Sequence, residues 1–167
     1  MLAAASIVLV DTMIVIEAVD TGCWNAITGQ LRVVTSAECA DELRRGDVSR
    51  PGYVPVRDED MRRASVQEVS LEAKVGLQLR YPDVHRLDAG ECDLLAIATD
   101  LTGDFYLCSC DKAAVVAAHA LGLLDRVISL QVLAASVGAR PARAFKAQYG
   151  EKPFSVWRTA LLLGNRL

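Results

Sequence analysis

Short apolar runs that end near an acidic residue recur along the chain, and each is followed by a helical pattern. Ser6 to Val10 is a β-rich run that ends at Asp11, and the apolar spacing from Met13 through Ala18 then suits a helix. Leu31 to Val34 predicts a second strand, followed by a helix through about Arg45. Strands that alternate with helices at this spacing are typical of a parallel sheet covered on both faces.

The second half of the chain repeats this order. Phe105 to Ser109 predicts a core strand that ends at Cys110-Asp111, and Lys112 to Leu121 predicts an alanine-rich helix. Arg126 to Leu130 predicts a last short strand. We therefore expect an α/β fold, namely a three-layer α/β/α sandwich with a central, mostly parallel sheet.

The middle of the chain is less regular. Residues 46–53 predict a loop, and Val54 to Val56 is compatible with a short strand beyond it. Residues 69–79 predict a helix that stops before Pro82, and residues 87–98 predict a turn followed by a largely buried helix.

The chain has 167 residues and is 52% hydrophobic, so it can bury a sizeable core. We predict an α/β domain over 1–130 and a basic helical extension over 131–167, packed on or beside it. As alternatives, the extension is an added helical layer or dimer surface, which we prefer, or an RNA-binding arm. Its basic and aromatic residues are Arg140, Arg143, Lys146, Lys152, Arg158 and Arg166, with Phe145, Tyr149, Phe154 and Trp157 between them.

Charge and cysteine content restrict the class of protein. A formal charge of −3 and a pI near 5.4 argue against an abundant, non-specific nucleic-acid coat protein, but not against a nuclease. The five cysteines form no CxxC pair, which is typical of a reducing compartment. The apolar start lacks a basic segment and is interrupted by Asp11, so we expect a buried strand rather than a signal peptide or anchor, no membrane association and a cytoplasmic protein.

Four acids are expected to meet at one edge of the sheet. In an open parallel sheet, ligands bind at the carboxyl ends of the strands, where Asp11 and Asp111 lie; Glu42 and Asp93 lie on helices facing the same edge. Clustered carboxylates repel one another unless a cation neutralises them, and oxygen ligands without His or Cys favour Mg²⁺ or Mn²⁺. The alternative for Asp11 and Asp111 is a helix N-cap, and for Asp93 a favourable interaction with the helix dipole.

Four segments, IVLVDTMIVIEA, VVTSAECADELRR, LDAGECDLLAIATD and YLCSCDKAAVVAAHALGL, resemble in order and approximate spacing the signature of PIN-domain proteins. The resemblance covers about residues 5 to 130. It implies a Mg²⁺- or Mn²⁺-dependent ribonuclease whose catalytic and metal-binding residues are Asp11, Glu42, Asp93 and Asp111. Many small PIN proteins are VapC-type toxins, which implies a homodimer restrained by an antitoxin protein.

Residues near the four acids have supporting roles in this hypothesis. Thr12 and Ser109 place hydroxyls beside the metal ligands, and Glu91 is expected in the first turn of its helix, where it can hold a metal-bound water. Glu38 lies one turn before Glu42 and is an alternative to it. Candidate contacts to the RNA backbone are Arg44, Arg45, Arg62 and Arg63, although such pairs are usually solvated.

Met13 is the main departure from the PIN pattern, which usually has Asn or Ser two residues after the first acid. It keeps open a catalytically silent PIN-like module that binds RNA or protein. A metal-dependent nuclease acting on DNA or flaps is a further alternative. A haloacid-dehalogenase-type phosphatase is rejected, because it needs Asp at this position.

Overall fold

The computed structural model describes residues 6–165 and 167. The first five residues, where the predicted domain begins, and Arg166 of the basic extension lie outside the described part. Within the described part, no helix combines the length and apolar character that crossing a membrane requires.

Within the described residues, five strands form one parallel sheet in the order β3-β2-β1-β4-β5. β1 lies at the centre and pairs with β2 and β4, with Leu9 opposite both Val34 and Leu107. The outer pairs, β2 with β3 and β4 with β5, are parallel as well. The strands are β1 (Ile7–Val10), β2 (Arg32–Ser36), β3 (Ser65–Gln67), β4 (Phe105–Cys108) and β5 (Val127–Ile128).

Helices connect the strands and extend beyond the last one. The α-helices are α1 (Thr12–Asp20), α2 (Trp24–Gln30), α3 (Ala37–Arg44), α4 (Asp58–Met61), α5 (Leu71–Arg80), α6 (Ala89–Asp100), α7 (Lys112–Ala120), α8 (Leu130–Ser136) and α9 (Glu151–Leu162). Three short 3₁₀ helices are η1 (Pro82–Arg86), η2 (Leu124–Arg126) and η3 (Ala147–Tyr149).

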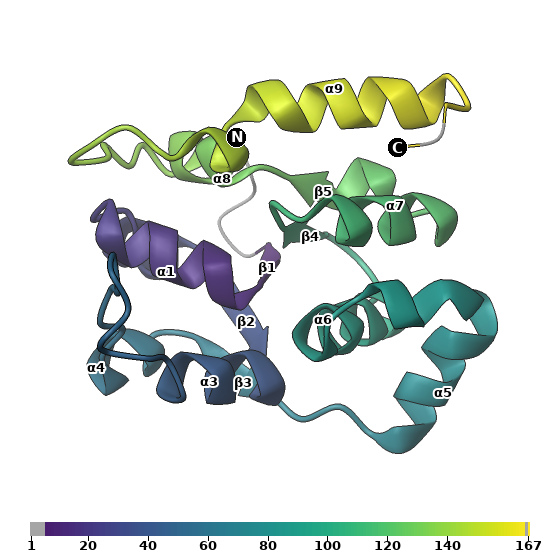
Figure 1. Ribbon diagram of the computed structural model, residues 1–167, viewed down its shortest axis with the longest axis horizontal. Coiled ribbons are helices and arrows are strands. Elements are labelled where there is room, and N and C mark those ends of the chain that lie inside the picture. Colours follow the sequence, from purple (N-terminus) through teal and green to yellow (C-terminus); the bar gives the residue numbers. More distant parts are fainter. Residues whose placement is uncertain (1–5, 166) are drawn as a thin grey trace.

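Alternating strand residues belong to two apolar cores, one on each face of the sheet. Leu9 and Leu107 pack in the core formed with α5, α6, α7 and α9. Val8, Val10 and Cys108 pack in the core formed with α1, α2 and α8. Figure 1 shows α1 and α6 on opposite sides of the strands. The prediction of a three-layer α/β/α sandwich with a parallel sheet is confirmed.

One edge strand of the sheet is not the one expected from the sequence. The segment Val54 to Val56, considered as a short strand, is irregular, and β3 pairs with β2 instead. Pro55 has no backbone N–H to donate to a ladder, which disfavours a strand there. The helices α2 and α4 were not predicted; α4 is a single turn whose first three residues are all acidic.

The C-terminal extension packs against the rest of the protein. Figure 1 shows α9 running alongside α7 and α8. Phe154 and Leu161 of α9 belong to the same buried cluster as residues of β1 and α6, and Tyr149 of η3 belongs to the opposite cluster. Two aromatic residues of the extension, Tyr149 and Phe154, are therefore buried, while Phe145 and Trp157 are partly buried against the same clusters.

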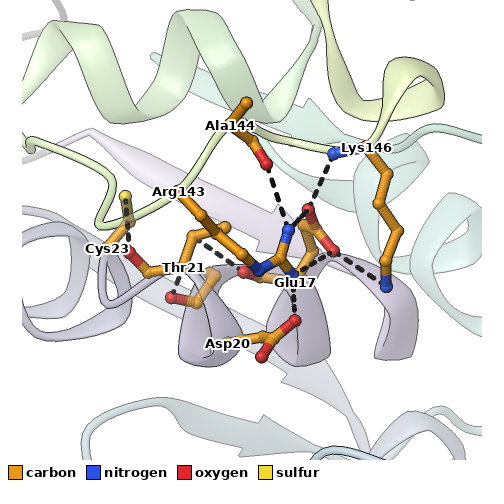
Figure 2. A network of polar contacts seen from close by, with 8 residues as sticks. Glu17, Asp20, Thr21, Cys23, Arg143, Ala144 and Lys146 are labelled. Carbon is orange, nitrogen blue, oxygen red and sulfur yellow. Dashed lines mark hydrogen bonds and ion pairs between the residues drawn. The ribbon is translucent and has the colours of Figure 1, made fainter. Parts of the chain in front are cut away.

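A buried carboxylate joins the loop before η3 to α1 (Figure 2). Glu17 of α1 is fully buried; its Oε1 accepts a hydrogen bond of 3.0 Å from the backbone N–H of Lys146, and its Oε2 lies 3.2 Å from Lys146 Nζ. The Arg143 guanidinium lies 3.4 Å from Glu17 Oε1 and also pairs with Asp20. Two acids of α1 thus face two cations of the extension.

These contacts decide the charge state of Glu17. Burial alone would raise its pKa, but the backbone N–H and ammonium of Lys146, together with Arg143, outweigh this effect and hold the pKa below its ordinary value. Glu17 is therefore charged at neutral pH, and its ion pairs fix the loop of the extension on α1.

We expect Glu17→Gln to lower the free energy of unfolding at pH 7 by about 1–3 kcal/mol, because two cations lose a charged hydrogen-bond partner. Since the pKa of folded Glu17 is lowered, this stabilisation is present above the ordinary value of 4.5 and is lost as the pH falls further. Urea unfolding at pH 7 and near pH 3.5 measures the difference, with exposed Glu68→Gln as control. A difference that does not shrink at the lower pH would contradict the ion-pair account.

Candidate functional site

A pocket of about 240 Å³ lies among the loops and helix starts that follow the strands, and we call it the acidic pocket. None of its lining residues among those described is basic, so the carboxylates face one another without a cation. Its lining comprises Asp11, Glu42, Asp88, Glu91 and Asp111 together with Thr12, Met13, Cys39 and Cys110.

Asp11 and Asp111 follow two neighbouring strands and also begin helices. Asp11 Oδ1 accepts a hydrogen bond of 2.7 Å from the backbone N–H of Ile14 and caps α1. Asp111 Oδ1 accepts from Ala113 N at 2.6 Å and Ala114 N at 3.3 Å and caps α7. Both residues therefore occupy the cap positions considered in the sequence analysis, and both line the pocket.

Glu42 reaches the pocket from α3 and is held by Thr12. The Thr12 hydroxyl donates to Glu42 Oε2 at 2.5 Å and also lies 3.4 Å from the carbonyl oxygen of Cys39. Glu38, the alternative to Glu42, pairs with Arg45 at 3.2 Å and does not line the pocket. The structure thus places Glu42, rather than Glu38, among the clustered acids.

The start of α6 brings two more acids to the pocket. Asp88 Oδ1 accepts from the backbone N–H of Glu91 at 2.7 Å, and Glu91 Oε2 accepts from Asp88 N at 3.1 Å, which is a reciprocal capping box. Asp88 was not singled out in the sequence analysis. Asp88 followed three residues later by Glu91 is the sequence pattern of a capping box, and this pattern indicates that Asp88 begins the helix.

Asp93 is not brought together with the other acids. It is buried, and its Oδ1 lies 2.7 Å from the Nζ of Lys74 on α5, whose pKa it raises. Residues two apart on an α-helix point in very different directions, so Glu91 and Asp93 cannot share a face. Glu91, expected as a supporting residue, lies where Asp93 was expected.

Of the remaining predicted residues, Ser109 lies beside the acids, whereas the four arginines do not line the acidic pocket. The Ser109 hydroxyl accepts from Asp111 N at 3.2 Å and hydrogen-bonds the Asp11 side chain, so it supports both acids. Arg44 pairs with Asp41 at 2.8 Å, and Arg44 and Arg62 line a different cavity, of about 640 Å³. Arg45 and Arg63 line neither this cavity nor the acidic pocket.

Burial and mutual repulsion favour protonated acids in the pocket. Burial raises the pKa of Asp11 to about 6, against the hydrogen bonds from Ile14 and Ser109, and nearby Asp88 and Asp111 add to the rise. Burial also raises the pKa of Glu91 to about 8, with the charge of Asp111 as the next cause. The carboxyl groups of the pocket therefore lack a neutralising cation at neutral pH.

The donor types suit a hard divalent cation. Carboxylate oxygens are the preferred ligands of Mg²⁺ and Mn²⁺, and five carboxyl groups share this pocket. Within residues 6–165 and 167, no group of three or more His, Cys, Asp or Glu side chains is arranged as it stands to hold a metal ion. Coordination therefore requires the carboxylate side chains to move closer together.

Comparison of the chain with family models, with curated proteins and with solved structures gives no match.

Gly90 allows α6 to approach α3 closely enough to bring Glu91 near Glu42. A Cβ at this position would lie 2.8 Å from Cys39 Sγ and 3.5 Å from Glu42 Oε1. We expect Gly90→Ala to destabilise the protein by about 1–3 kcal/mol through overpacking, measured by urea unfolding.

Two further variants test the cause of this effect. Gly76→Ala, in α5, meets nothing within 4 Å and should be neutral or stabilising. Adding Cys39→Ala to Gly90→Ala removes the sulfur that the new methyl group meets and should recover part of the stability. A double variant no more stable than Gly90→Ala would show that the contact with Cys39 is not the cause.

The metal-free protein should be less stable at pH 8 than at pH 5. Because the pKa values of folded Asp11 and Glu91 are raised to about 6 and about 8, the folded state binds more protons than the unfolded state above pH 4.5. Stability then falls as the pH rises, and we expect Tm to drop by several degrees, since 1 kcal/mol corresponds to about 2–4 °C at this size. Thermal unfolding in EDTA measures this, and Glu91→Gln should flatten the profile. A Tm that rises across the window would contradict it.

Proposed function

We propose that this protein is a metal-dependent ribonuclease of the PIN type, which hydrolyses phosphodiester bonds in the acidic pocket. The observation that carries the proposal is the gathering of five carboxyl groups at the carboxyl edge of a parallel sheet, with no basic residue among the described lining. A phosphodiester is itself an anion and would be repelled by these groups alone. A divalent cation resolves both problems, because it neutralises the acids and attracts the phosphate.

The proposed ligands are Asp11, Glu42, Glu91 and Asp111. When bound to them, Mg²⁺ or Mn²⁺ would supply an activated water and stabilise the charge that develops on the phosphodiester. Asp11 and Asp111 keep one carboxylate oxygen each for the helix N-termini, which fixes the direction of the other. Thr12 orients Glu42, and Asp88 orients the first turn of α6 on which Glu91 lies.

The geometry favours Glu91 over Asp93 as the third acid of the PIN-like pattern. Asp93 faces Lys74 and is already neutralised, whereas Glu91 faces the other acids with a pKa raised by burial and by Asp111. Asp93 then has a structural part in holding α5 against α6.

The cellular role follows from the resemblance alone. Small PIN proteins of the VapC type act as toxins, so we propose cytoplasmic RNA as the substrate, a homodimeric state and an antitoxin protein that restrains the activity. The choice of RNA over DNA has the same basis, and a DNA substrate is the first alternative to exclude.

Purified protein should cleave labelled single-stranded RNA with Mg²⁺ or Mn²⁺ and lose this activity in EDTA. We expect Asp11→Asn and Glu91→Gln each to lower the cleavage rate by at least about 100-fold, because each removes a ligand from the ion. Asp93→Asn is the matched control, two residues from Glu91, and should retain the rate while losing stability.

Substrate and metal controls separate the alternatives. Single-stranded DNA and flap substrates of the same sequence, tested in parallel, identify a DNA nuclease if they are cut faster than RNA. Folded protein that neither cuts any substrate nor binds Mn²⁺ would refute the metal-dependent nuclease and favour a silent binding module. A rate that falls in Asp93→Asn but not in Glu91→Gln would reverse the choice of the third acid.

A further inference from the structure

A second cavity, of about 430 Å³, adjoins the acidic pocket and shares Met13 and Glu42 with it. We call it the side cavity. Its walls come from α1, α3, the loop over 46–56 and Lys146 of the C-terminal extension. The two cavities are therefore neighbours, and one extended ligand can reach both.

The loop that forms one wall has a defined conformation. Arg50 to Tyr53 is a turn in which the Tyr53 N–H donates to Arg50 O at 3.0 Å, with Pro51 second and Gly52 third. Gly52 has φ +79°, which the third position of a type II turn requires and which glycine adopts without strain. The turn thus places Arg50 and Tyr53 together at the cavity.

The Tyr53 ring is packed against the start of the same loop. A Cβ at Gly46 would lie 3.0 Å from Tyr53 Cε2, so one edge of the ring lies close to the glycine backbone. Tyr53 is half-buried and lines the side cavity. An aromatic ring held at one edge by backbone is a ready surface for a flat group.

The lining combines apolar walls with two cations and two acids, Glu42 and Asp47. Ile16, Val54 and Val56 supply apolar surface, and Arg50 and Lys146 supply positive charge. Lys146 is fixed in place, because its backbone N–H and its ammonium both bind Glu17 (Figure 2). A pocket of this size, largely apolar with a few placed polar groups, suits a small organic group rather than an ion.

We propose that the side cavity binds one nucleobase of single-stranded nucleic acid, stacked on Tyr53, next to the phosphate that lies in the acidic pocket. This inference rests on the proposed nuclease function and specifies its substrate class. A base in a duplex has both faces covered by its neighbours and cannot reach such a cavity, whereas an unpaired base can be turned out and stacked on an aromatic side chain. Arg50 then lies beside the flanking sugar-phosphate, while Lys146 stays paired with Glu17.

The test compares a short single-stranded RNA with the same ribose-phosphate backbone lacking bases, by fluorescence anisotropy. The wild-type protein with Ca²⁺ in place of Mg²⁺ is the background, so that all four proposed ligands are kept, and the oligomer is verified to be intact after each measurement. Adding Tyr53→Ala should weaken binding of the base-bearing RNA about tenfold and leave binding of the base-free backbone unchanged. Tyr53→Phe keeps the ring and should keep the preference for bases.

Two controls exclude a general effect on the loop. Val48 lies in the same loop, is highly exposed and does not line the side cavity, so Val48→Ala should change neither affinity. Arg50→Ala should weaken binding of both oligomers, since it removes charge rather than stacking. Thermal unfolding of each variant verifies that the fold is kept.

The outcomes separate this inference from the proposed function. Equal losses for the two oligomers in Tyr53→Ala, or no loss in either, would overturn base binding even if RNA cleavage depends on Asp11. Preference for the base-bearing oligomer that requires Tyr53 would support base binding even if no cleavage is found, and would then describe a binding module. Tighter binding of duplex than of single-stranded RNA would also overturn it.

Discussion

The parallel pairing of β1 with both β2 and β4 determines where the acids of this protein lie. Because all three strands run in the same direction, their carboxyl ends lie at the same edge of the sheet. The helices α1, α3 and α7, which follow these strands, all begin at that edge. Val10 lies opposite Cys108, so β1 and β4 end side by side; Asp11 follows at once, and Asp111 follows after Ser109 and Cys110. The start of α6 approaches this edge because Gly90 lets it pass close to Cys39. Any shift of register would disperse the cluster.

The N-cap role and the proposed metal-ligand role of the acids support each other. Asp11, Asp88 and Asp111 each accept a backbone N–H at the start of a helix, and the partial positive charge of these helix ends offsets some of the repulsion within the pocket. The compensation is incomplete, because burial still raises the pKa of Asp11 and Glu91. A cap uses one carboxylate oxygen and leaves the other for a ligand, so the two readings of these residues are compatible.

Sequence patterns predicted the layers, four of the five strands and the positions of Asp11, Glu42 and Asp111, because strand-to-helix joins are local features. Local sequence does not decide whether Glu91 or Asp93 faces the other acids. This depends on the residue that caps α6 and on Lys74 of the preceding helix α5, which takes Asp93 as its partner. The edge strand β3 was missed since it is short and exposed, and so lacks the apolar pattern of the inner strands.

The C-terminal extension shows why charge counted along a sequence is a poor guide to nucleic-acid binding. Arg143 and Lys146 face Glu17 and Asp20 of α1, and Arg158 pairs with Asp125, so these cations are matched by acids that are distant in sequence. The extension is therefore not a free basic arm over its described residues. If the acidic pocket binds phosphate, most of the attraction must come from a bound cation, with Arg50 assisting at the side cavity. A net charge of −3 is then compatible with a nuclease, because the metal carries the missing positive charge.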